Sequence, residues 1–404
     1  MKTKTSKINL IVIIAVFGLE LFAEGILNPI LPLYLTSIGI APKILGLMFS
    51  FVWIGMVIGE GTWGWISDKL GLTIPLSVGT FLSGLSVLGF TLSSNVPVIF
   101  SIFLFWGIVR SAIFGPIRGY IGKNVPTVNK ATFMAIFNSI MIASSCFGAF
   151  PSGFIVEALG YSWNFYISSG ISFLAGIILI GGLKSRLPVV NERPIIDLKL
   201  GKFFFSQIRG SIFRAITIQC LVTALAHIGF GILMTFLPLL ATQVIGTNAS
   251  EVGLLFGVAG LSTVVLAIPI GKLADRKARK GIMILGLLIA AFGLAGISFI
   301  RIYWWLVVIC VFFEIGMTMF NSASLALLSE RVSPQYQGTA MGFYGAIGEN
   351  MGTIAGAALG GVFWSFWGPK TFLLGMIAGF LGMIICFFLV QAKALVNVRS
   401  IIKT

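Results

Sequence analysis

Charged residues are scarce in this sequence. Asp, Glu, Lys and Arg together make up 10% of the 404 residues, whereas hydrophobic residues make up 57%. With so little charge and a mean hydropathy of +1.04, the chain falls outside the composition of soluble globular domains. The shortage of charge excludes a soluble fold and indicates a protein that crosses the membrane several times.

Residues and motifs for catalysis and metal binding are also missing. The chain has one histidine and four cysteines, and each cysteine falls in a different apolar segment with no paired spacing. We therefore expect no disulfide, no metal site and no cofactor. The sequence has no phosphate-binding Gly-x-x-x-x-Gly-Lys-(Ser/Thr), no His-Glu-x-x-His and no Gly-x-Ser-x-Gly. These absences argue against an enzyme and exclude an ATP-driven pump made from this chain alone.

Long apolar segments take up most of the chain. A spanning helix needs about 20 mostly apolar residues to cross the hydrocarbon and to satisfy its own backbone hydrogen bonds. Twelve segments meet this requirement: 8–35, 43–67, 73–93, 97–118, 131–155, 162–183, 213–240, 250–272, 281–300, 303–328, 338–363 and 370–391. Glycines recur every three or four residues in the eleventh segment, from Gly342 to Gly360, which predicts a close-packing seam.

Basic residues outnumber acidic ones, with 27 Lys and Arg against 12 Asp and Glu. The net charge of +15 could indicate nucleic-acid binding or membrane topology. All but four of the basic residues fall in the two tails and in alternate loops; the exceptions are Lys43, Arg301, Lys370 and Arg110. Because cytoplasmic loops collect Lys and Arg, we interpret the charge as topology, with no nucleic-acid partner. Both termini are predicted to face the cytosol across the plasma (inner) membrane.

The longest polar segment separates the sixth and seventh spans. We predict that residues 185–211 form a cytoplasmic linker between an N-terminal bundle, residues 1–184, and a C-terminal bundle, residues 212–404. The run Phe203-Phe-Phe205 among basic residues would suit a short helix on the inner membrane surface. A simple tether is the alternative.

An internal repeat relates the two halves. Two copies of one motif lie 207 positions apart: Gly64-Trp-Ile-Ser-Asp68-Lys69-Leu-Gly71 and Gly271-Lys-Leu-Ala-Asp275-Arg276. The same shift superposes Thr132-Phe-Met134 on Thr339-Ala-Met341. Repeated six-helix halves are typical of transporters, in which the substrate path runs between the halves. We therefore predict an all-α membrane protein of twelve transmembrane helices in two pseudo-symmetric six-helix bundles, present as a monomer in the lipid bilayer.

The repeated motif has a functional interpretation as a gate. In each copy a glycine, an aspartate four residues later and a basic residue stand where an apolar segment ends. Glycine lets neighbouring helices approach closely, and Asp68 or Asp275 at the membrane edge could pair with a cation or a helix N-terminus in one gate state only. The alternative is that both aspartates merely end helices in water.

Six ionisable side chains fall near the middle of predicted spans, where a charge is costly. They come from five helices: Glu20, Glu24, Arg110, His227, Glu314 and Glu349. Polar residues continue three of these faces at helical spacing. These residues are Asn28 on the first helix, Thr318 and Asn321 on the tenth, and Thr353 on the eleventh, where Asn350 directly follows Glu349. We predict that this set lines an aqueous cavity between the halves, in which the substrate binds.

Proton coupling requires an acid whose proton affinity changes when the cavity opens to the other side. Desolvation favours the protonated carboxyl, and a nearby arginine favours the charged form. Our hypothesis is that Glu24, with Glu20 as the alternative, is the coupling acid and that Arg110 is its electrostatic partner. A fixed structural ion pair between two helices is the competing interpretation.

The remaining ionisable groups leave more alternatives open. His227 is the only histidine and could relay protons, or it could be an ordinary hydrogen-bonded core residue. Glu314 and Glu349 could bind a cationic substrate, supply a second proton site, or serve only as structural hydrogen-bonding groups.

The sequence resembles the major facilitator superfamily over essentially its whole length. The Gly-x-x-x-Asp-(Arg/Lys)-x-Gly pattern of that family matches at Gly64, Asp68, Lys69 and Gly71, where the resemblance implies a latch on the cytoplasmic gate. The stretch Gly25-Ile-Leu-Asn28-Pro29-Ile-Leu-Pro32-Leu-Tyr34, together with Arg110, is similar to the drug:proton antiporter branch. The resemblance implies a secondary active transporter that works by alternating access, with protons and a small molecule as its partners.

Three functions remain open at this point. Proton-driven export of amphipathic or cationic compounds, as in multidrug efflux, is favoured over proton-coupled uptake of a metabolite and over a lipid-handling or sensing role. Five acids in or near the predicted cavity, counting Glu60, face one cation, Arg110. This imbalance favours a cationic or neutral lipophilic substrate over a polyanion.

Overall fold

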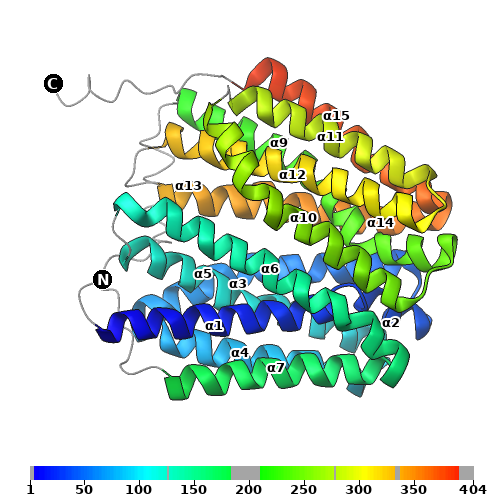
Figure 1. Ribbon diagram of the computed structural model, residues 1–404, viewed down its shortest axis with the longest axis horizontal. Coiled ribbons are helices and arrows are strands. Elements are labelled where there is room, and N and C mark those ends of the chain that lie inside the picture. The colour runs from blue at the N-terminus through cyan, green and yellow to red at the C-terminus, as the bar shows by residue number, and fades with distance from the viewer. Residues whose placement is uncertain (1–3, 125–126, 183–209, 277–278, 333–336, 391–404) are drawn as a thin grey trace.

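The computed structural model describes residues 4–124, 127–182, 210–276, 279–332 and 337–390 (Figure 1). Most of the predicted linker, with its proposed amphipathic helix, lies outside these residues. The side chains of Asp68, Asp275 and Arg276 are outside the described part as well.

The N-terminal half contains six membrane-crossing segments. The first is α1 (Lys4–Leu27), continued by α2 (Leu31–Ser37); the others are α3 (Pro42–Leu70), α4 (Thr73–Leu92), α5 (Val96–Asn124), α6 (Thr127–Leu159) and α7 (Tyr161–Gly182). Pro29 falls in the break between α1 and α2, and Pro32 lies in the first turn of α2. A proline at that position loses no helical hydrogen bond, because the first backbone N–H groups of a helix have no partner within it.

The C-terminal half repeats this arrangement. Four of its segments are the single helices α10 (Ala249–Arg276), α11 (Arg279–Phe299), α12 (Tyr303–Arg331) and α15 (Phe372–Leu389). The first segment is α9 (Gly210–Leu239), which the π-helix η1 (Leu240–Ile245) continues. The fifth is a composite span made of α13 (Gln337–Phe343), the π-helix η3 (Tyr344–Asn350) and α14 (Met351–Trp367). The short 3-10 turn η4 (Gly368–Thr371) joins the last two.

Each of the twelve predicted spans corresponds to one of these segments. Length and composition alone distinguish eleven apolar runs within the described residues instead of twelve. The run Ala340–Leu389, of 50 residues, is counted once although it contains both final segments. Several helices extend beyond their predicted limits; α5, for example, continues to Asn124. Hydropathy detects only the part of a helix inside the hydrocarbon, whereas the helix itself continues into the polar zone.

The two halves lie next to each other (Figure 1). Helices α1, α4 and α7 lie toward one edge of the molecule, α11 and α15 lie toward the other, and α6 packs against α10 between them. A second contact between the halves joins α3 to α14. The start of α1 and the end of α15 lie at the same end of the bundle. A chain that crosses a membrane an even number of times must begin and end on the same side.

Close approach between the halves is concentrated at the end of the molecule where α2 lies. A methyl group added to Gly153 of α6 would overlap the carbonyl of Ala249, and one added to Gly46 of α3 would overlap the carbonyl of Ala357. By contrast, a side chain added at Gly64 or Gly271 would meet no described atom within 4 Å. Neither of these motif glycines makes a close contact with the described residues, and the gate role that the sequence predicts for the motif stays a prediction.

The predicted glycine seam lies along the contact of α14 with α9. A methyl group on Gly352 would overlap the carbonyl of Ala224, and one on Gly356 would overlap the carbonyl of Ile228. Gly342, at the start of the same glycine series, has no described neighbour within 4 Å. The seam is thus confirmed for α14, and it does not extend back to Gly342.

We expect Gly356→Ala to lower the free energy of unfolding by about 1–3 kcal/mol, because the added methyl overpacks the α9–α14 contact. The measurement is equilibrium unfolding of the purified protein in mixed micelles, followed by circular dichroism. Gly342→Ala is the matched control; it adds a methyl to open space and should leave stability unchanged or raise it by about 0.5–1 kcal/mol. Equal effects of the two substitutions would contradict the seam.

Candidate functional site

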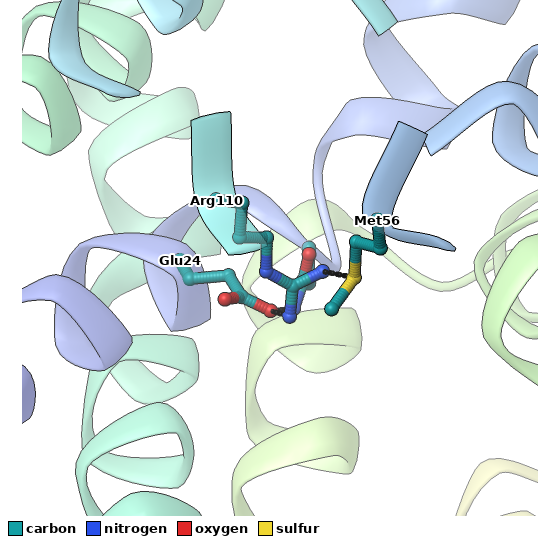
Figure 2. A network of polar contacts seen from close by, with 4 residues as sticks. Glu24, Met56 and Arg110 are labelled. Atoms are coloured by element: carbon teal, nitrogen blue, oxygen red, sulfur yellow. Dashed lines mark hydrogen bonds and ion pairs between the residues drawn. The ribbon is translucent and has the colours of Figure 1, made fainter. Parts of the chain in front are cut away.

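An ion pair between α1 and α5 lies within the N-terminal half. Nη2 of Arg110 is paired with Oε1 of Glu24, and Figure 2 shows the guanidinium lying between Glu24 and Met56. The side chains of Arg110 and Glu24 are 14% and 13% exposed. The structure thus brings together the two residues that the sequence analysis paired, in a largely buried position.

Neighbouring groups fix both partners of the pair. The amide of Asn28, one turn after Glu24, donates a hydrogen bond to the same carboxylate oxygen at 3.1 Å. Nη1 of Arg110 donates to the sulfur of Met56 at 3.7 Å. The guanidinium carbon also lies 5.8 Å from the ring centroid of Trp53 and 5.9 Å from that of Trp106, within the range of cation–π attraction.

Glycines position the residues around Arg110. A methyl group on Gly55 of α3 would overlap the carbonyl of Leu104, and one on Gly107 of α5 would overlap the carbonyl of Val52. Because α3 and α5 touch at the backbone here, Trp53 and Met56 of α3 lie beside the guanidinium. The guanidinium of Arg110 therefore contacts two indole rings and the thioether of Met56 as well as the carboxylate of Glu24.

A small pocket adjoins the ion pair. Its volume is about 20 Å³, which is room for about one water molecule. Its polar lining comes from four helices of the N-terminal half: Glu20 and Glu24 of α1, Ser83 of α4, Arg110 of α5, and Ser168 and Ser172 of α7. The other lining residues are apolar, so polar and apolar side chains share the walls of the pocket.

Glu20 faces this pocket but takes no part in the ion pair. Oγ of Ser172 donates a hydrogen bond to Oε2 of Glu20 at 3.2 Å. The residue is 6% exposed, and its second oxygen, Oε1, has no hydrogen-bond partner within the described part of the chain. Glu20 is thus a deeply buried carboxyl with half of its bonding capacity unused.

The predicted polar groups of the C-terminal half do not line this pocket. Thr263 of α10 donates a hydrogen bond to Oε2 of Glu314 on α12 at 3.1 Å. Thr318 donates instead to the backbone carbonyl of Glu314, at 2.7 Å, so its hydroxyl serves its own helix. Oδ1 of Asn321 is buried without a hydrogen-bond partner in the described structure. Glu314 therefore lies on α12, beside α10, the helix that packs on α6 of the other half.

The remaining polar residues of this half lie where α9 meets the composite span. Nδ1 of His227 is 3.0 Å from the carbonyl of Thr223, and the residue is 7% exposed. Glu349 and Asn350 close the π-helix η3, which packs on α9. A π-helical turn inside an α-helix is often found at functional sites.

The described pocket is separate from the chamber predicted between the two halves, and that chamber stays a prediction. Glu20, Glu24 and Arg110 do gather around one space, but this space lies inside the N-terminal half. His227, Glu314 and Glu349 are on other elements and are absent from its lining. Position along the span fixed the depth of each group but not the direction in which its side chain points.

Sequence reasoning missed several residues of the site. Ser168 and Ser172 are one turn apart on α7, as are Trp106 and Arg110 on α5. These spacings are visible in the sequence and would have pointed to one polar face and one cation–π pair. Met56 and Ser83 carry no such signal in the sequence.

A second buried network was also missed. Arg331, assigned from the sequence to the cytoplasmic charges, is 1% exposed. Its Nη1 donates to Oε1 of Gln219 at 3.1 Å, and Nε2 of Gln219 donates to Oγ of Ser324 at 3.0 Å. The hydroxyl of Tyr344 donates to the same serine oxygen at 2.9 Å. This network joins α9, α12 and η3.

The described gate residues have local roles. Nζ of Lys69 lies 4.0 Å from the ring centroid of Trp65. Gly71 ends α3 with a φ of 79°, a conformation that favours glycine. This geometry gives Gly71 a structural role in ending the helix.

Comparison with known proteins adds independent information. A family model described as Major Facilitator Superfamily matches residues 13–217 and 219–403. An uncharacterized MFS-type transporter of Methanocaldococcus jannaschii is 25% identical over 335 residues, covering 82% of this chain and 85% of that protein. The multidrug resistance protein MdtG of Citrobacter koseri is 21% identical, covering 83% and 84%. Multidrug resistance protein 2 of Bacillus subtilis is 20% identical and covers 84% of each chain.

Solved structures share the fold. The D-xylose-proton symporter superposes with a TM-score of 0.77 at 15% identity, covering 97% of this chain and all of that one. The nucleoside transporter NupG superposes with a TM-score of 0.72 at 15% identity, covering 94% and 97%. Together with the helices described above, these likenesses confirm the predicted all-α fold of twelve transmembrane helices in two bundles.

We expect a thermodynamic cycle to reveal strong coupling between Glu24 and Arg110. Removing one partner of a buried pair leaves an uncompensated charge and typically costs about 3–5 kcal/mol. Glu24→Gln and Arg110→Met should each destabilise the protein, and the double variant should lose much less than the sum, measured by unfolding in mixed micelles. The exposed pair of Arg279 and Glu330 is the matched control and should couple by about 0–1 kcal/mol. Additive losses at Glu24 and Arg110 would rule out a direct interaction.

Proposed function

The chain belongs to the major facilitator superfamily, and on that premise we propose that it is a proton-coupled secondary transporter that exports amphipathic or cationic small molecules. It is a multi-pass membrane protein of a family whose members transport small molecules. The observation that carries the proposal is the largely buried pair of Glu24 and Arg110 beside a polar pocket. The relatives named multidrug resistance proteins support the choice of export.

Proton binding at Glu24 would change the forces between α1 and α5. The carboxylate is attracted to the guanidinium at short range in a site of low dielectric constant. A proton on Glu24 removes this attraction, while Arg110 keeps its contacts with Met56, Trp53 and Trp106. The two helices can then shift relative to each other, so that the protonation state and the conformation become linked.

The contacts between the halves support alternating access. Gly46 and Gly153 close one end of the interface, and at that same end Glu157 of α6 accepts a hydrogen bond from the N–H of Ser250, the second residue of α10, at 2.7 Å. At the other end, Gly64 and Gly271 face open space among the described residues. We propose that the closed end faces outward and that both termini are in the cytosol of the plasma membrane, with the protein working as a monomer.

The acids of the C-terminal half support a cationic substrate. Glu314 lies on α12, beside the helix that borders the N-terminal half, and its carboxylate receives one described hydrogen bond from Thr263. Glu349 adds a second acid on η3. We propose that Glu314 binds the positive group of the substrate, together with Asn321, which lies two turns further along the same face of α12.

Glu24→Gln should abolish proton-driven transport, because glutamine cannot exchange a proton, while the destabilised variant still folds and inserts into the membrane. The measurement is movement of the lipophilic cation ethidium in proteoliposomes under an imposed pH gradient. Glu330→Gln, at a surface carboxyl 46% exposed, is the matched control and should transport normally. Full proton-driven transport by Glu24→Gln would remove Glu24 from the mechanism. Ethidium moving in the same direction as protons would favour the alternative function, proton-coupled uptake.

Glu314→Gln should weaken binding of ethidium and spare an uncharged dye of similar size. A hydrogen bond to a charged group contributes about 1.5–3 kcal/mol, which corresponds to a roughly ten- to hundredfold rise in Kd. Fluorescence titration of the purified protein measures both dyes, with Glu330→Gln again as control. Equal weakening for the two dyes would indicate a structural role for Glu314.

A further inference from the structure

The proposed function leaves one buried acid without a role. Glu20 lies one turn before Glu24 and lines the same pocket, yet the arginine of that pocket is paired with Glu24. Oε1 of Glu20 has no hydrogen-bond partner within the described residues, although the residue is only 6% exposed. Natural proteins seldom leave a buried polar atom unpaired without a reason.

We propose that Glu20 binds a proton of its own, separate from the proton exchanged at Glu24, and that one water molecule in the pocket joins the two carboxyl groups. The role of this second proton in transport rests on the proposed function. The binding of the proton itself does not, because it follows from the charges and hydrogen bonds of the pocket.

The charges around the pocket favour a neutral Glu20. The ionisable residues that line it are Glu20 and Glu24 from α1 and Arg110 from α5, whereas the polar residues from α4 and α7 are serines. With both acids ionised, two negative charges would share one positive charge in an apolar enclosure. A buried charge without a partner costs several kcal/mol, and a neighbouring like charge adds to that cost. One proton on Glu20 leaves the pocket with no net charge.

The hydrogen bonds of the pocket fit a carboxylic acid with a water beside it. Oε2 of Glu20 accepts from Ser172 at 3.2 Å, which leaves Oε1 to carry the proton and to donate. A space of about 20 Å³ accommodates one water, which needs two to four polar partners. Glu20, Glu24 and Ser83 supply them, because all three line this space.

The water provides a path for a balanced proton transfer. The O–H of Glu20 gives its proton to the water, and the water gives one of its own protons to the carboxylate of Glu24. The products are an ionised Glu20 and a protonated Glu24, so the number of protons and the net charge are unchanged. Glu20 can thus supply a proton to Glu24 from within the N-terminal half.

Infrared spectroscopy of the purified protein tests the second proton without any substrate. We expect a carbonyl-stretch band of a protonated carboxylic acid at neutral pH that is lost in Glu20→Gln and kept in Glu24→Gln. Ser172→Ala should shift this band to higher frequency, because it removes the hydrogen bond to Oε2, and this variant retains the acid if Glu20→Gln fails to fold. A wild-type band that persists in Glu20→Gln, or that does not respond to Ser172→Ala, would overturn the proposal.

The water link has a separate test. Ser83→Val places a methyl group in the pocket and should slow deuteration of the Glu20 band after transfer to heavy water. Ser86→Val is the matched control, since Ser86 is a buried serine of α4 outside the pocket lining. An unchanged rate in Ser83→Val would exclude the bridging water. If the wild-type protein shows no proton-driven transport while the Glu20 band is present, the proposed function fails and the second proton stands.

Discussion

The cost of placing a charge inside the hydrocarbon governs the structure around Arg110. Water cannot solvate the guanidinium at this depth, so the protein must supply a carboxylate, an acceptor and polarisable surfaces in its place. Glu24, Met56, Trp53 and Trp106 provide these, and they come from three different helices. The arrangement of α1, α3 and α5 is thus constrained by the needs of a single side chain. A change in the charge of Glu24 therefore alters the forces on all three helices.

Glycine determines how closely these helices can approach. Gly55 and Gly107 bring α3 against α5, and Gly352 and Gly356 bring α14 against α9. Each half is therefore a tightly packed unit. Within the described residues, the glycine contacts between the halves run from Gly46 and Gly153, at the end where α2 lies, along α10 to Gly260. Rigid halves joined along this contact can rock about it without repacking their interiors, which is the kind of motion that alternating access requires.

The sequence predicted the parts of this structure that depend on hydropathy and depth. The twelve spans follow from apolar length, and the pairing of Glu24 with Arg110 follows from two opposite charges at one depth. The rotation of each side chain around its helix was not predictable to the same degree. Glu20 and Glu24 are one turn apart, yet only Glu24 pairs with the arginine. Arg331 was assigned to the cytoplasmic surface because a charge at the end of a span normally reaches water, and its burial depends on Gln219, a residue 112 positions away.

The separation of the polar groups into two halves has a mechanistic consequence. The acids near Arg110 are enclosed within the N-terminal bundle, whereas Glu314 lies on the C-terminal bundle beside the interface. Under the proposed function, a substrate cation bound at Glu314 therefore need not displace the proton site directly in order to compete with it. Both would act on the same rigid-body motion, because a neutral Glu24 would weaken the attraction between α1 and α5 while an occupied Glu314 would change the charge near α6. In this proposal coupling arises from the two bundles sharing one interface, and it requires no contact between substrate and proton.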